Sequence, residues 1–203
     1  MFRAIVVPLG VLAIAACTPL TTATRSVSLG QGDVVATTPV GYCVDDVSSQ
    51  PASDFAVLAP CTSLGADSVA PDVIGVATVQ VGPAESGNAA ADELALRDFL
   101  ITDEGVSLLS QAGDASTVEI LSSQAFNSQV MVHFTDSSPP PLAGLQNEEW
   151  RAFTNVNGRL VTIGVRGLAV APLGDGPGAT LLKLILAGVQ AATTDTETSQ
   201  PEV

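Results

Sequence analysis

Basic residues are scarce in this chain. Seven Lys and Arg stand against 21 Asp and Glu among 203 residues, which gives a formal net charge of −14. Nucleic acids and anionic lipid headgroups are bound by basic patches, so neither is expected as a partner. The acidic residues are scattered along the chain rather than gathered in one block, and we interpret them as a solubilising surface.

Motifs for catalysis are also missing. No G-x-S-x-G surrounds a serine and no G-x-x-x-x-G-K-[ST] is present, which excludes the commonest hydrolase signature and the P-loop. His133 is the sole histidine, and a catalytic base needs a nucleophile and an orienting group beside it. We therefore interpret His133 as a surface or lightly packed residue, and we predict a protein that is not an enzyme and holds no cofactor. A pocket that holds acids of perturbed pKa near His133 would favour an enzyme instead, and a filled core would count against one.

Cysteine is rare, with three residues in the chain. Cys43 and Cys61 lie in strand-like segments, residues 33–44 and 55–61, joined by the turn-forming sequence SSQPAS. A hairpin would bring the two thiols together, and a disulfide is the default for such a pair in an exported protein. The alternative is a redox or metal pair, but the spacing is not C-x-x-C and zinc normally takes four ligands. With only His133 to add, we predict a disulfide and no metal site.

The third cysteine, Cys17, ends the longest apolar run. Residues 1–16 carry one positive charge, Arg3, followed by uncharged apolar residues. This run is shorter than the roughly 20 residues that cross a bilayer, so it predicts a signal peptide. The sequence Ile14-Ala15-Ala16-Cys17 resembles the lipobox of bacterial lipoproteins, in which an aliphatic residue and two small residues precede the cysteine.

The resemblance to lipoproteins implies a lipid anchor. In that family the chain is cleaved before the cysteine, whose thiol and new amino group are acylated, so Cys17 would be the lipid attachment site. Two or more acyl chains hold a protein stably on a membrane. Thr18, where inner-membrane lipoproteins have Asp, implies the outer membrane of a Gram-negative cell, with the protein facing the periplasm. The alternative is an ordinary leader cut at an A-x-A-type site beside a chance cysteine.

Composition divides the rest of the chain into three parts. Residues 17–33 would be the lipidated cysteine and a flexible tether, because they are rich in Thr, Ser and Gly. Residues 34–193 are long enough for one domain with its own core. Residues 194–203 are almost wholly polar and are predicted to be a disordered tail.

The first half of the predicted domain contains a strand and a helix. Residues 73–81, VIGVATVQV, are β-branched and uncharged, which predicts a buried strand. Residues 86–101 have apolar residues at helical spacing and Asn88 as a candidate cap, which predicts a helix lying on the sheet. An extension of this helix past Gly105 to Leu109 stays open.

The second half begins with four predicted strands. Residues 117–124 and 129–136 form the first pair, with Val130, Val132 and Phe134 on one face. The Asn-Gly pair at 157–158 then predicts a type I′ turn, because both of its central residues need positive φ. This turn pairs Trp150 with Val165 and places the Trp150 face toward the core.

A second main helix follows the sequence GDGPG, with Asp175 and Pro177 at its entry. Its apolar residues extend almost all round, which predicts a well-buried helix; they are Leu181, Leu184, Ile185, Leu186 and Val189. The predicted fold class is α+β: a single domain in which an antiparallel sheet carries two main helices, an αβα-type sandwich. The element order over residues 94–192 resembles the PsbP-like fold of photosystem subunits, Ran-binding Mog proteins and some bacterial lipoproteins. That resemblance implies a scaffold or binding role and carries over no site residue.

The sequence leaves two functions open. The first is a non-enzymatic envelope lipoprotein that binds a protein partner, to which the proline-stiffened loop SSPPPLAG, residues 137–144, could present Leu142 and Leu145. The alternative is a small-ligand binding module with a pocket between sheet and helix. A long solvent-facing groove would distinguish them.

Overall fold

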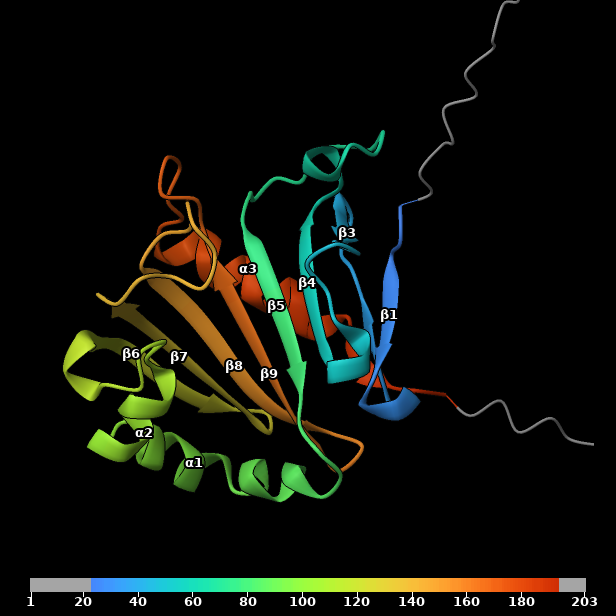
Figure 1. The fold of residues 1–203 in the computed structure, drawn as a ribbon. Coiled ribbons are helices and arrows are strands. Elements are labelled where there is room, and N and C mark those ends of the chain that lie inside the picture. Colours follow the sequence, from blue (N-terminus) through green and yellow to red (C-terminus); the bar gives the residue numbers. More distant parts are fainter. Residues whose placement is uncertain (1–22, 194–203) are drawn as a thin grey trace, which may run out of the picture.

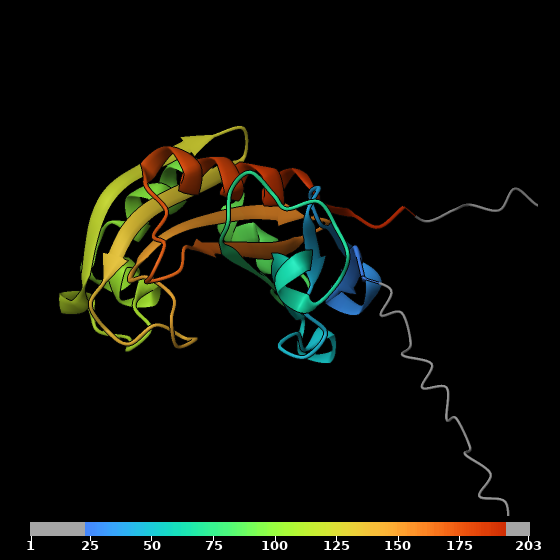
Figure 2. The same cartoon turned by 90° about the horizontal axis from the view of Figure 1, so that it is seen from above.

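The computed structural model describes residues 23–193. The predicted signal peptide, Cys17 and the predicted tail after residue 193 lie outside the described residues. A seven-stranded antiparallel sheet, in the order β3-β4-β5-β9-β8-β7-β6, forms the centre of the molecule (Figure 1). One face carries α3 (Asp175–Ala187), and the other carries α1 (Glu93–Leu100) and α2 (Asp103–Leu109) (Figure 2). The predicted α+β, αβα-type single domain is therefore confirmed.

The strands fall into two sheets, and short 3-10 helices occupy several of the connections. The large sheet contains β3 (Tyr42–Val44), β4 (Phe55–Pro60), β5 (Val76–Val81), β6 (Val118–Phe126), β7 (Gln129–Asp136), β8 (Glu148–Val156) and β9 (Arg159–Arg166). The small sheet contains β1 (Ser26–Leu29), β2 (Val34–Thr37) and β10 (Val189–Ala191). The 3-10 helices are η1 (Gly30–Gly32), η2 (Pro51–Ser53), η3 (Cys61–Leu64), η4 (Ser86–Ala90) and η5 (Ala115–Thr117).

The flexible tether predicted for residues 17–33 is wrong for its last part. Residues 26–29 form β1, which pairs antiparallel with β2 from Ser26 opposite Thr37 to Leu29 opposite Val34. Polar and apolar residues alternate in β1, and Leu29 is buried in the main core. Because the segment is rich in Ser and Gly, its composition concealed this alternation. The folded domain therefore begins before Val34.

Two predictions of local pairing are confirmed. Asn157 and Gly158 have φ values of 52° and 78°, as a type I′ turn requires, and Trp150 lies opposite Val165. Cys43 and Cys61 form a disulfide with their Cα atoms 4.9 Å apart, on the antiparallel pair β3 and β4 and the turn that follows it.

The first predicted helix differs from the structure at its start and in its middle. Asp92, not Asn88, caps α1, because its carboxylate accepts hydrogen bonds from two backbone amides of the first turn. Thr102 caps α2, so the extension toward Leu109 is a separate helix. The two helices meet closely at Gly105, where a Cβ would collide with the Phe99 carbonyl.

The last helix was predicted to be well buried, but only one of its sides is buried. Leu181, Leu182 and Ile185 pack in the main core, whereas Lys183 is exposed and Leu184 is 49% exposed. The reason is that α3 is an outer layer, with the sheet on one side only. Among the described residues, no helix combines the length and the apolar character that a membrane crossing needs.

Two cores lie on opposite faces of the sheet. The main core joins α3 to β3, β4, β5, β8 and β9 and includes Trp150, Ile163 and Leu181. The second core packs Val130, Val132 and Phe134 against α1 and α2, as the alternation in this strand predicted. Successive residues of β7 and β8 therefore point to opposite faces of the sheet. Each face also holds one group of polar side chains, described below.

Candidate functional site

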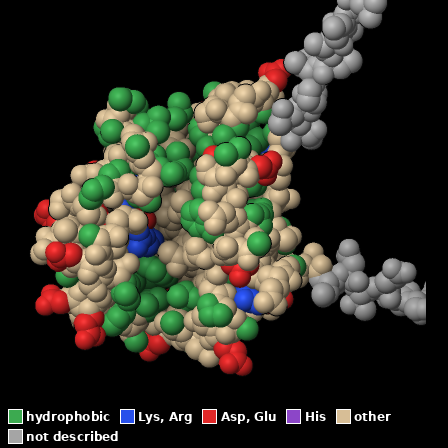
Figure 3. All heavy atoms as spheres, viewed as in Figure 1, with side chains coloured by type: hydrophobic (Ala, Val, Ile, Leu, Met, Phe, Trp, Pro, Cys, Tyr) green, Lys and Arg blue, Asp and Glu red, His purple; other side chains and the backbone are tan. Residues whose placement is uncertain are grey.

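A groove of about 380 Å³ lies on the face of the sheet opposite α3. Figure 3 shows this face, where the surface is hollowed and Lys or Arg side chains lie within the recess. One rim comes from the loop between β7 and β8, with Pro141, Leu142 and Leu145, and the other from the segment between β3 and β4, including Gln50. Neither α1 nor α2 contributes a residue to the lining, so the floor is the open part of the sheet.

Strand periodicity explains why the floor is polar. In β5, Ala77, Val79 and Val81 are buried in the main core, and Thr78 and Gln80 face the groove. The same alternation in β9 sends Thr162, Gly164 and Arg166 to the groove. The groove is thus the solvent-facing side of strands whose other side builds the core.

A buried charge cluster lies in this floor. Glu149 accepts two hydrogen bonds from Arg151, at 2.7 and 3.0 Å, and one from Arg166 at 2.5 Å. The side chains of Glu149 and Arg166 are each 5% exposed. A Cβ at Gly164 would lie 2.7 Å from the Glu149 carboxylate, so this glycine gives the carboxylate its space. A buried ion pair needs such complete hydrogen bonding to offset the loss of hydration.

The charge cluster leaves an excess positive charge in the groove. Two arginines share one carboxylate, and Glu149, Arg151 and Arg166 are the only charged side chains among the described residues that line it. The chain as a whole has a net charge of −14. The groove is therefore a local positive site on an acidic protein, suited to an anionic group.

The same cluster fixes the loop that forms the rim. Arg166 donates to the carbonyls of Gln146 and Asn147, at 3.0 and 3.2 Å. The Gln146 side chain accepts a hydrogen bond of 2.7 Å from the amide of Leu173. The sequence predicted an exposed loop with two presented leucines, but Leu145 is only 8% exposed, while Leu142 is 41% exposed. Anchoring at Gln146 draws the end of the loop inward and leaves Leu142 at the rim.

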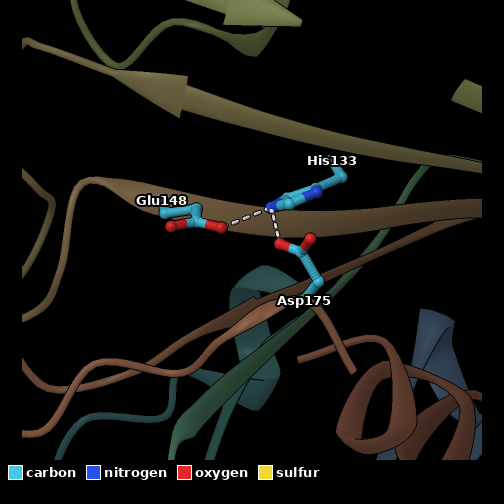
Figure 4. A group of neighbouring side chains, drawn as sticks. All are labelled: His133, Glu148 and Asp175. Atoms are coloured by element: carbon cyan, nitrogen blue, oxygen red, sulfur yellow. Dashed lines mark hydrogen bonds and ion pairs between the residues drawn. The ribbon is translucent and has the colours of Figure 1, made fainter. Parts of the chain in front are cut away.

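The opposite face holds a second cavity, also of about 380 Å³, between the sheet and the first half of α3. His133 lies in it with its Nε2 atom 2.6 Å from an oxygen of Glu148 and 4.0 Å from an oxygen of Asp175 (Figure 4). Its ring stacks on Trp150, the residue opposite it in β8, with ring centroids 4.4 Å apart. Lys183 also lines the cavity.

The interpretation of His133 as a surface or lightly packed residue is wrong. Its side chain is 11% exposed and is held on both sides, by Trp150 and by Glu148. The hydrogen-bond partner of His133 is the carboxylate of Glu148, which orients the imidazole ring. Glu148 and Glu149 are adjacent in the sequence, and the only available signal that they point to opposite faces was their position in a strand.

The turn-forming sequence SSQPAS, residues 48–53, lies in the connection from β3 to β4, and η2 lies within it. Asp45, at the start of this connection, accepts hydrogen bonds from the amides of Val47 and Ser48. Burial raises the pKa of Asp45, but these hydrogen bonds lower it by more, so the carboxylate is held below its usual range.

Comparison with known proteins finds a fold but no family. No family model matches the chain, and no curated protein matches it. A point mutant of the protein Mog1 superimposes with a TM-score of 0.50 at 12% identity, covering 85% of this chain and 98% of that one. The domain therefore belongs to the class of α+β proteins with the Mog1 fold, which confirms that part of the predicted resemblance.

Two further solved structures are similar at lower scores. The Ran-binding protein Mog1p of Saccharomyces cerevisiae has a TM-score of 0.48 at 12% identity, over 83% of this chain and 95% of that one. The cyanobacterial PsbP protein of Synechocystis has a TM-score of 0.43 at 13% identity, over 88% of this chain and 98% of that one.

Proposed function

We propose that this protein is a non-enzymatic binding module of the bacterial cell envelope, anchored in a membrane by lipid at Cys17, and that it binds a protein partner in the groove over β5 and β9. The observation that carries the proposal is the excess positive charge of the groove floor beside the exposed Leu142. The partner surface would offer an acidic group to the floor and apolar side chains to the rim. The Ran-binding name of one protein of similar fold accords with a protein-binding role.

The groove combines apolar and charged side chains, as protein–protein interfaces do. Interfaces combine an apolar centre with polar groups that fix register, and aromatic and arginine residues are enriched in them. Here Phe55, Pro141 and Leu142 supply apolar surface, and Arg151 supplies charge. Arg151 also lies over the ring of Phe134, 5.1 Å from its centroid, which holds the guanidinium in place. A preorganised cation lowers the cost of binding an anionic group.

The short connection to the predicted anchor limits where binding would occur. Because β1 begins at Ser26, only residues 18–25 separate it from Cys17. At about 3.4 Å per residue, a span of this length reaches roughly 27 Å. The domain would therefore work close to the membrane, at the outer membrane and facing the periplasm in a Gram-negative cell.

A second candidate function is the binding of a small molecule. The cavity beside His133 favours it, because about 380 Å³ falls within the range of ligand pockets and the cavity lies between sheet and helix. The groove is preferred for the main function because the apolar side chains of Phe55, Pro141 and Leu142 lie there beside the charge of Arg151.

Photo-cross-linking in intact cells tests the proposal. A photoreactive amino acid replaces Leu142 in one full-length variant and Leu184 in another. Both leucines are about half exposed, at 41% and 49%, and they lie on opposite faces of the molecule. We expect a reproducible protein adduct from position 142 that is absent from position 184.

The groove chemistry is tested in the same cells. A change that adds a negative charge at the rim, Leu142→Asp, should repel an acidic partner, whereas Leu184→Asp should not. Cross-linking from a second groove position, Gln50, should then fall several-fold only in the Leu142→Asp variant. Equal adducts from both faces, or no loss with Leu142→Asp, would refute binding in the groove.

A further inference from the structure

Three metal-ligand side chains from three different elements converge in the cavity beneath α3. They are His133 of β7, Glu148 of β8 and Asp175 at the start of α3. One ligand atom from each lies within 4.8 Å of the others. Figure 4 shows both carboxylates directed toward the same ring nitrogen of His133.

We propose that His133, Glu148 and Asp175 form a binding site for a divalent transition-metal ion of the zinc type. Imidazole nitrogen with carboxylate oxygen is a donor set that suits Zn²⁺, whereas Mg²⁺ and Ca²⁺ prefer oxygen alone. Three protein ligands with a water molecule in the fourth position complete a tetrahedral ion. The two carboxylates also supply the negative charge that a dication needs.

Small adjustments bring the ligands to metal geometry. With metal–ligand bonds of about 2.0–2.2 Å, neighbouring ligand atoms lie roughly 3–3.5 Å apart. The oxygen of Glu148, 2.6 Å from Nε2, must withdraw slightly, and that of Asp175, 4.0 Å away, must approach. The Asp175 side chain is 90% exposed, so a change of its rotamer meets no packed neighbour.

The surroundings fix the buried ligand and leave the outer one accessible. Trp150 stacks on the imidazole with the two rings 14° from parallel, which holds the ring plane as second-shell partners do in metal sites. Among the described residues, the ion-pair partner of the Asp175 carboxylate is His133, at 4.0 Å. The His–Glu hydrogen bond holds two of the three ligands in place, and the start of α3 brings Asp175 beside them.

Trp150 provides a direct measurement, because it is the only tryptophan in the chain. The full-length protein in detergent is titrated with ZnCl₂, and Trp150 emission is followed while equilibrium dialysis counts the bound zinc. We expect a saturable change with one zinc per chain that MgCl₂ does not produce. Asp175→Asn should weaken binding by at least about tenfold.

Asp103→Asn is the matched control. Asp103 is the first residue of α2, as Asp175 is the first residue of α3, and it is also exposed. This control should bind zinc as the unmodified protein does, and Glu148→Gln should bind it more weakly. The proposal is overturned if dialysis finds no zinc bound at about 1 mM, a concentration that marks very weak binding. Equal affinities of Asp175→Asn and Asp103→Asn would overturn it as well.

Discussion

Glu148 and Glu149 are neighbours in β8, but their carboxylates lie on opposite faces of the sheet and belong to different sites. Glu148 hydrogen-bonds to His133 on the α3 side, and Glu149 binds Arg151 and Arg166 in the groove. Their burial differs as well, with side chains 30% and 5% exposed. The pair therefore allows the two sites to be tested by the same chemical change one residue apart.

Loss of the Glu149 charge should destabilise the protein strongly. Glu149→Gln leaves the buried guanidinium of Arg166 and the partly buried one of Arg151 without a counter-charge, and breaking a buried pair typically costs about 3–5 kcal/mol. Glu148→Gln removes a charge from a partly exposed pair and should cost about 1 kcal/mol or less. Urea unfolding of both variants at neutral pH measures the difference. Similar losses in the two would contradict the structural role of the buried cluster.

The disulfide should contribute to stability as well. Replacing both cysteines, as in Cys43→Ala with Cys61→Ala, removes a crosslink between residues separated by 18 positions. The free energy of unfolding should fall by about 2–4 kcal/mol. Thiol titration provides the control: the folded, unreduced protein should show no free thiol from these two residues, and two reactive thiols would contradict the disulfide.

The hairpin and the disulfide could be predicted because local signals determine them. The Asn157-Gly158 turn fixes the register of β8 on β9 without reference to any other strand. The groove depends instead on β5 lying beside β9, two strands separated by α1, α2 and three other strands in the sequence. No local pattern specifies that pairing, so the sequence showed the alternation in each strand but not the surface that they form together.

The His133 site was missed for a related reason. His133 and Asp175 are 42 positions apart, and they meet only because α3 packs across β8 and β9. The metal site considered from the sequence combined His133 with Cys43 and Cys61, and these two cysteines form the disulfide. β1 was missed for a different reason. Its partner β2 is close in the sequence, but the composition of β1 and its neighbours is typical of a linker and concealed the strand.

Asp136 should make stability fall in acid. Burial raises its pKa, but hydrogen bonds from Gln111, Ser138 and Thr117 lower it by more, so the folded pKa lies below the ordinary value of 3.8. A lowered pKa means that stabilisation is full above the ordinary value and is lost as pH falls through the folded value. Asp136→Asn should cost about 1–3 kcal/mol at neutral pH, as for hydrogen bonds to a charged group.

The acid effect is measured by urea unfolding at a series of pH values from 7 to about 2. The gap between the unmodified protein and Asp136→Asn should narrow below about pH 4, because protonation removes the same charge that the substitution removes. The exposed Asp98, with a side chain 63% exposed, gives the control Asp98→Asn, which should stay close to the unmodified protein. A gap that is constant with pH would show that the charge of Asp136 does not stabilise the fold.

Membrane attachment should depend on Cys17 and not on cysteine content in general. If Ile14-Ala15-Ala16-Cys17 is processed as a lipobox, Cys17→Ser removes the thiol that receives the first lipid, and each lost methylene forfeits about 0.8 kcal/mol of membrane affinity. The variant should appear as an uncleaved precursor or in the soluble fraction, as measured by cell fractionation and mass spectrometry of the amino-terminal peptide. Cys43→Ser is the matched control, because it removes a cysteine from the disulfide and leaves the lipobox intact. It should remain in the membrane fraction, and normal maturation with membrane retention of Cys17→Ser would contradict the lipid anchor.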